Sequence, residues 1–398
     1  MITAEIYTTR RKKLTAVIGA DPIIITAFAS MQQTNDSAAP FVQESNFHWL
    51  TGIDEPNWKL VHYAESSWLV KPTKSEIHTI FDGGMSAAVA SSISGIADVL
   101  SESEYKELLD TIAQQHTTVR TLLRHPHSND YDFVLNPALQ KLHSQLQRVF
   151  SEVIDCRKEL SQLKAIKSDE EIELMQRAID ITIDGFEKVY SSLQSAAHEY
   201  EVEASLTHSF RAAGASGHAY EPIVGTGKNA CTLHYVANND ALPSSGMVLI
   251  DAGAKLRGYS ADITRTYAIG TPSQRERAIH AAVEQAHKAI IALIRPGVTV
   301  ESYQTNVDTI MKQALKDVGL LNKPADYRTY FPHAVSHGLG IDVHDSLGGY
   351  ESFQPGMVLT VEPGIYIPEE GIGVRIEDDI LVTVDGNKNL SEALPTSL

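Results

Sequence analysis

Residues 245–253 read SGMVLIDAG, and residues 355–364 read PGMVLTVEPG. Each is a buried-type strand that contains Gly-Met-Val-Leu and ends in an acid beside a small turn. A second strand-like stretch with another acid follows each of them, SADITRTYAI at 260–269 and GVRIEDDILV at 373–382. Two matched strand pairs with acids at their matched ends predict a duplicated half-domain, in which the acids converge across a pseudo-twofold axis.

Five side chains of the metal-ligand type lie in these stretches and in one glycine-rich segment, VSHGLG: Asp251, Asp262, His337, Glu362 and Glu377. A carboxylate at the end of an apolar strand loses its hydration unless a cation or a donor replaces it. Asp251 and Glu362 have no basic neighbour in their own strands. We therefore expect these acids to bind metal.

Four carboxylates and one imidazole form a ligand set for two divalent cations, because bridging carboxylates offset the repulsion between cations a few ångströms apart. Such a centre is typical of a hydrolase rather than of a structural site. The oxygen-rich donor set favours two Mn²⁺ ions. Co²⁺ and Zn²⁺ are also compatible with it, since the order of metal affinities does not exclude them.

Three further histidines and one arginine are expected near these acids. His234 lies in CTLHY, His333 in HAVSH and His344 in GLGIDVHD. A single one of the 16 histidines is more often structural, but the glycine-rich surroundings of these three favour acid–base and oxyanion-type roles. Arg375 shares a strand face with Glu377, since side chains repeat every two residues, so it should also enter the site.

Composition narrows the class of protein. A chain of 398 residues with 43% hydrophobic content should hold about two domains. The formal charge of −17 disfavours nucleic acid and anionic membranes as partners, because both select for basic patches. Cys156 and Cys231 are the only cysteines, so neither a disulfide framework nor a cysteine metal site is expected. Without a signal peptide or an apolar stretch long enough to span a membrane, we expect a cytoplasmic protein.

The chain is predicted to be α/β, or α+β, with domains at residues 1–155 and 156–398. The first part alternates strand-like apolar runs, IIITAFA, KLVHYA, SSWLV and HTIFD, with helical stretches such as SESEYKELLDTIAQQ. The second part should open with a helix at Ser168, where Glu171 completes a capping-box pattern. The apolar stripe of that helix comprises Ile172, Met175, Ala178 and Ile179.

Five motifs in order make the chain recognisable: IVGTGKNACTLHY, LIDAGAKLRGYSADITRT, HAVSHGLGIDVHD, LTVEPGIYI and GIGVRIEDDI. With QESNFHWLTG at 43–52 and LKAIKSDEEIELMQRA at 163–178, they resemble the creatinase, aminopeptidase P and prolidase family of pita-bread metallopeptidases. The match is close to its bacterial Xaa-Pro aminopeptidase branch. The resemblance implies a creatinase-like α/β domain before a catalytic pita-bread domain, and a homodimer or homotetramer.

The resemblance also implies how the five ligands are shared. Asp262 and Glu377 would bridge the two ions, Asp251 would bind one of them, and His337 and Glu362 would bind the other. The family reaction is attack by a metal-bridging hydroxide on the peptide bond before proline. Glu362 would then be a ligand and a proton shuttle.

Roles for the remaining site residues are implied in the same way. His344 and His234 would hydrogen-bond the substrate carbonyl region and the tetrahedral intermediate. His333 would line the proline pocket. Tyr366 and Arg375 would tie the site together by hydrogen bonds around the ligands.

The resemblance leaves three functions to compare. The leading prediction is an aminopeptidase that releases the N-terminal residue from peptides with proline second. An Xaa-Pro dipeptidase is the nearest alternative, and a catalytically silent peptide-binding scaffold is disfavoured because all five ligand positions are filled. Val42 and Asn46 stand where this branch usually has an Arg and an Asp, so recognition of the substrate's N-terminal amine is expected to differ.

Overall fold

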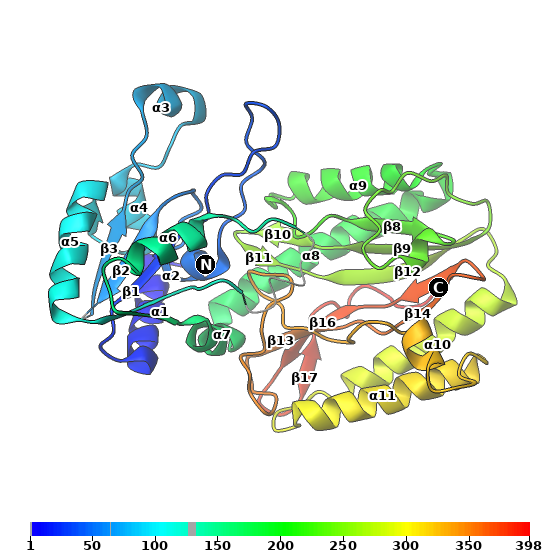
Figure 1. Ribbon diagram of the computed structural model, residues 1–398. Coiled ribbons are helices and arrows are strands. Elements are labelled where there is room, and N and C mark those ends of the chain that lie inside the picture. The colour runs from blue at the N-terminus through cyan, green and yellow to red at the C-terminus, as the bar shows by residue number, and fades with distance from the viewer. Residues whose placement is uncertain (1, 64, 126–132) are drawn as a thin grey trace. The chain divides into compact units, whose positions relative to one another are not determined.

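The computed structural model describes residues 2–63, 65–125 and 133–398, in two compact units, Ile2–Leu163 and Lys164–Leu398 (Figure 1). The division lies in helix α7 (Arg157–Ala165), later than the expected boundary after residue 155. The start of this helix is bonded to the first unit, since the amide of Cys156 donates to Thr121 O at 3.0 Å and Arg120 pairs with Glu159 at 3.2 Å. Contacts with residues more than 30 positions earlier therefore keep the start of α7 in the first unit.

A six-stranded mixed sheet forms the centre of the first unit, in the order β4-β3-β2-β1-β5-β6. Its strands are β1 (Ile23–Thr26), β2 (Lys59–Tyr63), β3 (Ser66–Val70), β4 (Asp98–Leu100), β5 (Thr118–Thr121) and β6 (Glu152–Asp155). Strand β2 is antiparallel to both of its neighbours, while β1, β5 and β6 run parallel to one another. Ile23, Ile24 and Ile25 are fully buried, which explains the continuous apolar run. The predicted α/β character is confirmed.

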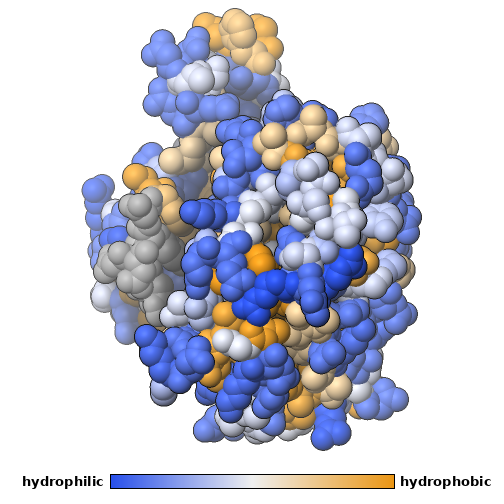
Figure 2. Space-filling view, turned by 90° about the vertical axis from the view of Figure 1, so that its right-hand side faces the viewer, coloured by the Kyte–Doolittle hydropathy of each residue, from blue (hydrophilic) through white to orange (hydrophobic). Residues whose placement is uncertain are grey.

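Seven helices of the described chain begin in this unit: α1 (Ala4–Ile18), α2 (Ser45–Thr51), α3 (Glu76–Asp82), α4 (Ala87–Ser94), α5 (Glu102–Gln115), α6 (Ala138–Leu146) and α7. The strand expected at HTIFD is wrong, because those residues lie in α3, which Ser75 caps by accepting from the amide of His78. Ile80 and Phe81 are 80% and 81% exposed, so their apolar character does not mark a buried strand. Figure 2 shows hydrophobic side chains gathered where α3 projects.

Helix α8 opens the second unit as the capping pattern predicted. It spans Asp169–Ser192, and the amide of Ser168 donates to Glu171 Oε2 at 3.0 Å. Met175 and Ala178 are buried along its apolar face. The other helices of this unit are α9 (Glu199–Ala212), α10 (Gln274–Ile291), α11 (Val300–Asp317) and α12 (Asp326–Tyr330). Among the described helices, none combines the length and the hydropathy needed to cross a bilayer.

The repeated sequences form two antiparallel strand pairs. Strand β9 (Gly246–Ala252) pairs with β12 (Ile263–Ile269), and β13 (Val358–Val361) pairs with β16 (Asp378–Val382). The accompanying strands are β7 (Gly217–His218), β8 (Ile223–Thr226), β10 (Ala254–Leu256), β11 (Tyr259–Ser260), β14 (Gly364–Ile367), β15 (Ile372–Arg375) and β17 (Asn387–Asn389). Helix α8 packs against the first pair at β12, and α10 packs against the second at β13, while α9 lies beside α8 and α11 beside α10 (Figure 1).

The two strand pairs meet at Thr264 and Glu377. The amide of Glu377 donates to Thr264 O at 3.0 Å, which makes an isolated bridge between the pairs. Arg265 is 1% exposed and donates to Glu377 O at 2.6 Å from the neighbouring position. Because this junction lies where the acids occur in sequence, it brings residues that are more than 100 positions apart into one site.

Candidate metal centre

The five ligand-type residues come from the ends of these strands and from one loop. Asp251 lies in β9, Asp262 directly before β12, Glu362 directly after β13, and Glu377 between β15 and β16. His337 belongs to the segment between α12 and β13. Asp251, Asp262 and Glu377 are 7%, 5% and 2% exposed. Their carboxylates are therefore largely removed from water.

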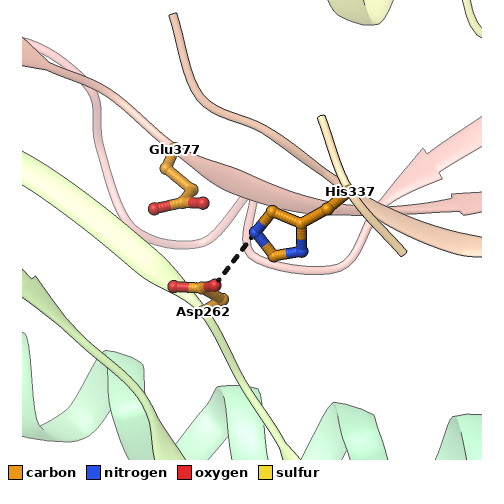
Figure 3. A group of neighbouring side chains, drawn as sticks. All are labelled: Asp262, His337 and Glu377. Atoms are coloured by element: carbon orange, nitrogen blue, oxygen red, sulfur yellow. Dashed lines mark ion pairs between the residues drawn. The ribbon is translucent and has the colours of Figure 1, made fainter. Parts of the chain in front are cut away.

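The side chains converge on a common space. One ligand atom from each of Asp262, His337 and Glu377 lies within 4.8 Å of the other two (Figure 3). His337 Nε2 is 3.5 Å from Asp262 Oδ2 and 3.6 Å from Glu362 Oε1. Tyr220 Oη lies 2.5 Å from an oxygen of both Asp251 and Asp262. The structure thus brings together all five residues that the sequence predicted as ligands.

Burial and mutual repulsion make this cluster costly without cations. Burial, and then the charge of Asp251, raises the pKa of Asp262 well above its usual range. The pKa of Glu377 is raised by burial and by Asp262, and that of Glu362 by burial and by Glu377. Arg375 is the only lysine or arginine among the described residues that line the site. An excess of buried carboxylates around a neutral imidazole fits divalent cations, which would relieve both the desolvation and the repulsion.

His337 is arranged as a nitrogen ligand. Its Nδ1 lies 2.9 Å from Gly338 O, so Nδ1 carries the proton and Nε2 directs its lone pair toward the acids. Burial lowers the pKa of His337 to about 4, which keeps the imidazole neutral at pH 7. The amide of Thr360 in β13 donates to His337 O at 2.9 Å, and this bond fixes the backbone beside Glu362.

The ligands open into a cavity of about 590 Å³, which His234, His333, His344 and Arg375 also line. The rings of His337 and His344 lie 4.4 Å apart, edge to face. Burial, and then the neighbouring His234, lowers the pKa of His344. Apolar side chains complete the wall, namely Ile223, Leu233, Val236 and Val343. The cavity thus combines an acidic centre, neutral imidazoles and an apolar surface.

Tyr366 lies outside this lining but bonds to two residues within it. His333 Nε2 is 2.9 Å from Tyr366 Oη, and Arg375 Nη1 donates to the same oxygen at 3.0 Å. Arg375 Nη2 contacts Asp251, and His333 Nδ1 is 3.5 Å from Glu362 Oε2. Burial raises the pKa of Tyr366 to about 12, so it acts as a neutral phenol. All ten predicted site residues therefore belong to one connected cluster.

Three residues of this cluster were missed by sequence reasoning. Tyr220 contacts both aspartates, although nothing in GHAYEP indicates a site. Thr264 Oγ1 donates to Glu377 Oε2 at 2.7 Å, and strand alternation from Asp262 could have found it. Asp379 Oδ2 accepts from the amide of Asp262 at 3.1 Å, a contact that depends on pairing between distant strands.

The two positions where the sequence departs from its branch lie in the first unit. Val42 is 64% exposed. Asn46 Nδ2 donates to Glu44 Oε1 at 2.8 Å, and Glu44 Oε2 accepts from the amide of Phe47 at 2.6 Å. Asn46 therefore takes part in the N-terminal cap of helix α2.

Comparison with known proteins finds one matching family model in each unit. The model for metallopeptidase family M24 matches residues 173–384, and that for the aminopeptidase P N-terminal domain matches residues 7–120. An Xaa-Pro aminopeptidase of Haemophilus influenzae is 35% identical, over 92% of this chain and 89% of the relative. The Xaa-Pro aminopeptidase of Escherichia coli is 32% identical, over 93% and 90%.

Solved structures of aminopeptidase P are similar to the whole chain. Proline aminopeptidase P II from Yersinia pestis has a TM-score of 0.85 and 31% identity, covering 100% of this chain and 98% of that one. Aminopeptidase P from Escherichia coli with the inhibitor Pro-Leu has a TM-score of 0.85 and 30% identity, covering 100% and 96%. The chain therefore belongs to metallopeptidase family M24, in its aminopeptidase P branch, and is a metallo-aminopeptidase.

Proposed function

We propose that this protein is an Xaa-Pro aminopeptidase with two divalent ions at its active site. The observation that carries the proposal is the convergence of three buried carboxylates, the part-buried carboxylate of Glu362 and the Nε2 atom of His337 on one cavity. The relatives named Xaa-Pro aminopeptidase and aminopeptidase P support the substrate class. Mn²⁺ is the favoured metal because oxygen donors outnumber the single nitrogen.

The ligands would be shared between the ions as the likeness to aminopeptidase P implies. Asp262 and Glu377 lie where the two strand pairs join, so they would bridge the ions. Asp251 would hold one ion, and His337 with Glu362 the other. When bound, the ions would lower the pKa of a water molecule toward neutrality and would polarise the scissile carbonyl.

Glu362 is placed to move the proton. Its two oxygens lie 3.6 Å from His337 Nε2 and 3.5 Å from His333 Nδ1, within the cavity. A carboxylate at this position can accept a proton and then release it. Glu362 would take the proton from the attacking water and donate it to the prolyl nitrogen as the peptide bond breaks.

His234 and His344 would stabilise the charge that develops on the carbonyl oxygen. Both line the cavity, and burial keeps His344 neutral by lowering its pKa. His333, bonded to Tyr366, would line the proline pocket. Arg375, bonded to Asp251 and Tyr366, would hold that ligand in place.

We expect His344→Ala to leave the metals bound and to lower kcat by roughly 10²–10³, the usual cost of losing one such donor. The check combines steady-state kinetics with metal analysis of the purified variant. His116→Ala in the first unit is the matched control and should retain full activity. Loss of metal from the His344 variant would contradict this role.

The substrate class is tested with the manganese-loaded enzyme. We expect it to release arginine from Arg-Pro-Pro, and mass spectrometry of the products would show this. Ala-Pro serves as the comparison, and Arg-Ala-Ala as the control that lacks proline. Hydrolysis of the dipeptide alone would establish an Xaa-Pro dipeptidase and overturn the proposed preference.

A further inference from the structure

His234 lies on a long segment between two strands. Residues 227–245 connect β8 to β9, and their only regular element in the described structure is a single turn at Asn229–Cys231. Leu233, His234 and Val236 of this segment line the active-site cavity. His234 itself is exposed. The position of its imidazole depends on how the segment is held.

Glu199 is bonded to the last residue of β8 and, within this segment, to Asn229, Tyr235 and Asp240. Glu199 Oε1 accepts from the amide and the hydroxyl of Thr226, both at 2.9 Å, and from Asn229 Nδ2 at 3.4 Å. Glu199 Oε2 accepts from Tyr235 Oη at 2.9 Å and from the amide of Asp240 at 3.0 Å. The backbone amide of Glu199 donates to Asp240 O at 3.0 Å. One carboxylate thus holds Thr226 and Asp240 together, the two ends of a stretch that contains His234.

The surroundings of Glu199 make these bonds important. Glu199 is the first residue of α9, and its side chain is 0% exposed. Within the described chain it makes no ion pair, so the five donors replace its lost hydration. All five donors come from residues 226–240. A displaced segment would leave the carboxylate buried without partners, which favours a single arrangement.

Tyr235 connects the Glu199 carboxylate to the backbone next to His234. Its hydroxyl bonds to Glu199, and it also accepts from the amide of Asn239 at 3.3 Å. Tyr235 is absent from the residues that line the cavity, whereas His234 and Val236 on either side are present. The anchored phenol therefore sets which way the adjacent imidazole faces.

We infer that Glu199 is a positioning residue that holds His234 at the scissile carbonyl through the Thr226–Asp240 segment. The inference rests on the proposed function, in which His234 assists the reaction. It assigns a role in catalysis to a carboxylate that contacts neither the predicted metal ligands nor the cavity.

The test is a double-mutant cycle in the metal-loaded full chain. We expect Glu199→Gln, which keeps the shape but weakens the acceptor, to lower kcat about tenfold with KM within twofold and metal content unchanged. In the His234→Ala background, the same change should lower kcat by less than twofold. An equal loss in both backgrounds, or no loss in either, would overturn the inference.

Two further variants keep the test decisive. Tyr235→Phe removes one donor and should give a smaller loss of kcat that also disappears with His234→Ala, even if Glu199→Gln does not fold. Glu201→Gln is the control, because this exposed carboxylate on the same helix accepts from the amide of Ala197, outside the segment. It should leave kcat unchanged.

Hydrogen exchange measured by mass spectrometry gives a readout that does not depend on activity. The amides of residues 232–237 should exchange at least about tenfold faster in Glu199→Gln and at the wild-type rate in Glu201→Gln. Unchanged exchange in Glu199→Gln would contradict the anchoring role. If the wild type fails to cleave Xaa-Pro peptides, the proposed function fails; if it cleaves them and the cycle is additive, only this inference fails.

Discussion

Glu362→Ala is expected to abolish turnover, with kcat lowered by about 10⁴-fold or more. In the proposed mechanism the side chain has two tasks, as a metal ligand 3.6 Å from His337 Nε2 and as the group that moves the proton. Loss of a positioned proton-transfer group alone costs roughly 10²–10⁴ in rate, and loss of a ligand adds to this. Kinetics and metal analysis of the same preparation would show both effects.

Two companion variants separate the tasks of Glu362. Glu362→Gln retains an oxygen that can face a cation but cannot accept the proton, so it should bind more metal than the alanine variant and turn over as slowly. Glu351→Ala, an exposed acid in the segment before β13, should behave like wild type. Turnover of Glu362→Ala within tenfold of wild type would show that another group carries the proton.

Removal of the metals should have the second large effect. A chelator is expected to lower activity below about 1% and to lower Tm by about 5–10 °C at pH 7, because ions that bind only the folded chain stabilise it. Without metal, the buried carboxylates raise one another's pKa. The metal-free protein therefore loses the most folding stability at a pH high enough to ionise these acids. Differential scanning calorimetry before and after Mn²⁺ is added back measures the shift.

A control shows whether this stabilisation comes from the proposed centre. Asp262→Asn combined with Glu377→Gln removes the charges of both proposed bridging ligands, and the chelator should then change Tm by less than about 1 °C. Full activity of the wild type in the presence of the chelator would contradict a metal-dependent reaction.

The centre was accessible from the sequence because its signals are local. Asp251 and Glu362 end apolar strands whose sequences echo each other, and burial at such positions demands a counter-charge. Strand alternation also predicts Arg375 on the same strand face as Glu377. In the structure both side chains line the cavity, and the Arg375 guanidinium donates to Asp251. Repetition and periodicity in the sequence thus indicate side chains that the structure brings together.

Other features depend on contacts that the sequence does not show. Tyr220 and Glu199 carry no pattern of their own, and their roles follow from partners more than 25 positions away. Residues 78–82 look like a strand by composition, yet the cap at Ser75 makes them helical. In these places tertiary structure or capping decides the outcome, and a hydrophobicity pattern cannot.

Anomalous diffraction at the manganese edge, from crystals grown with Mn²⁺, tests the two-ion centre most directly. The account predicts two peaks roughly 3.5–4 Å apart, with Asp262 and Glu377 bound to both. Asp251 should contact one ion, and His337 with Glu362 the other. A single peak, or two ions without a shared carboxylate, would contradict it.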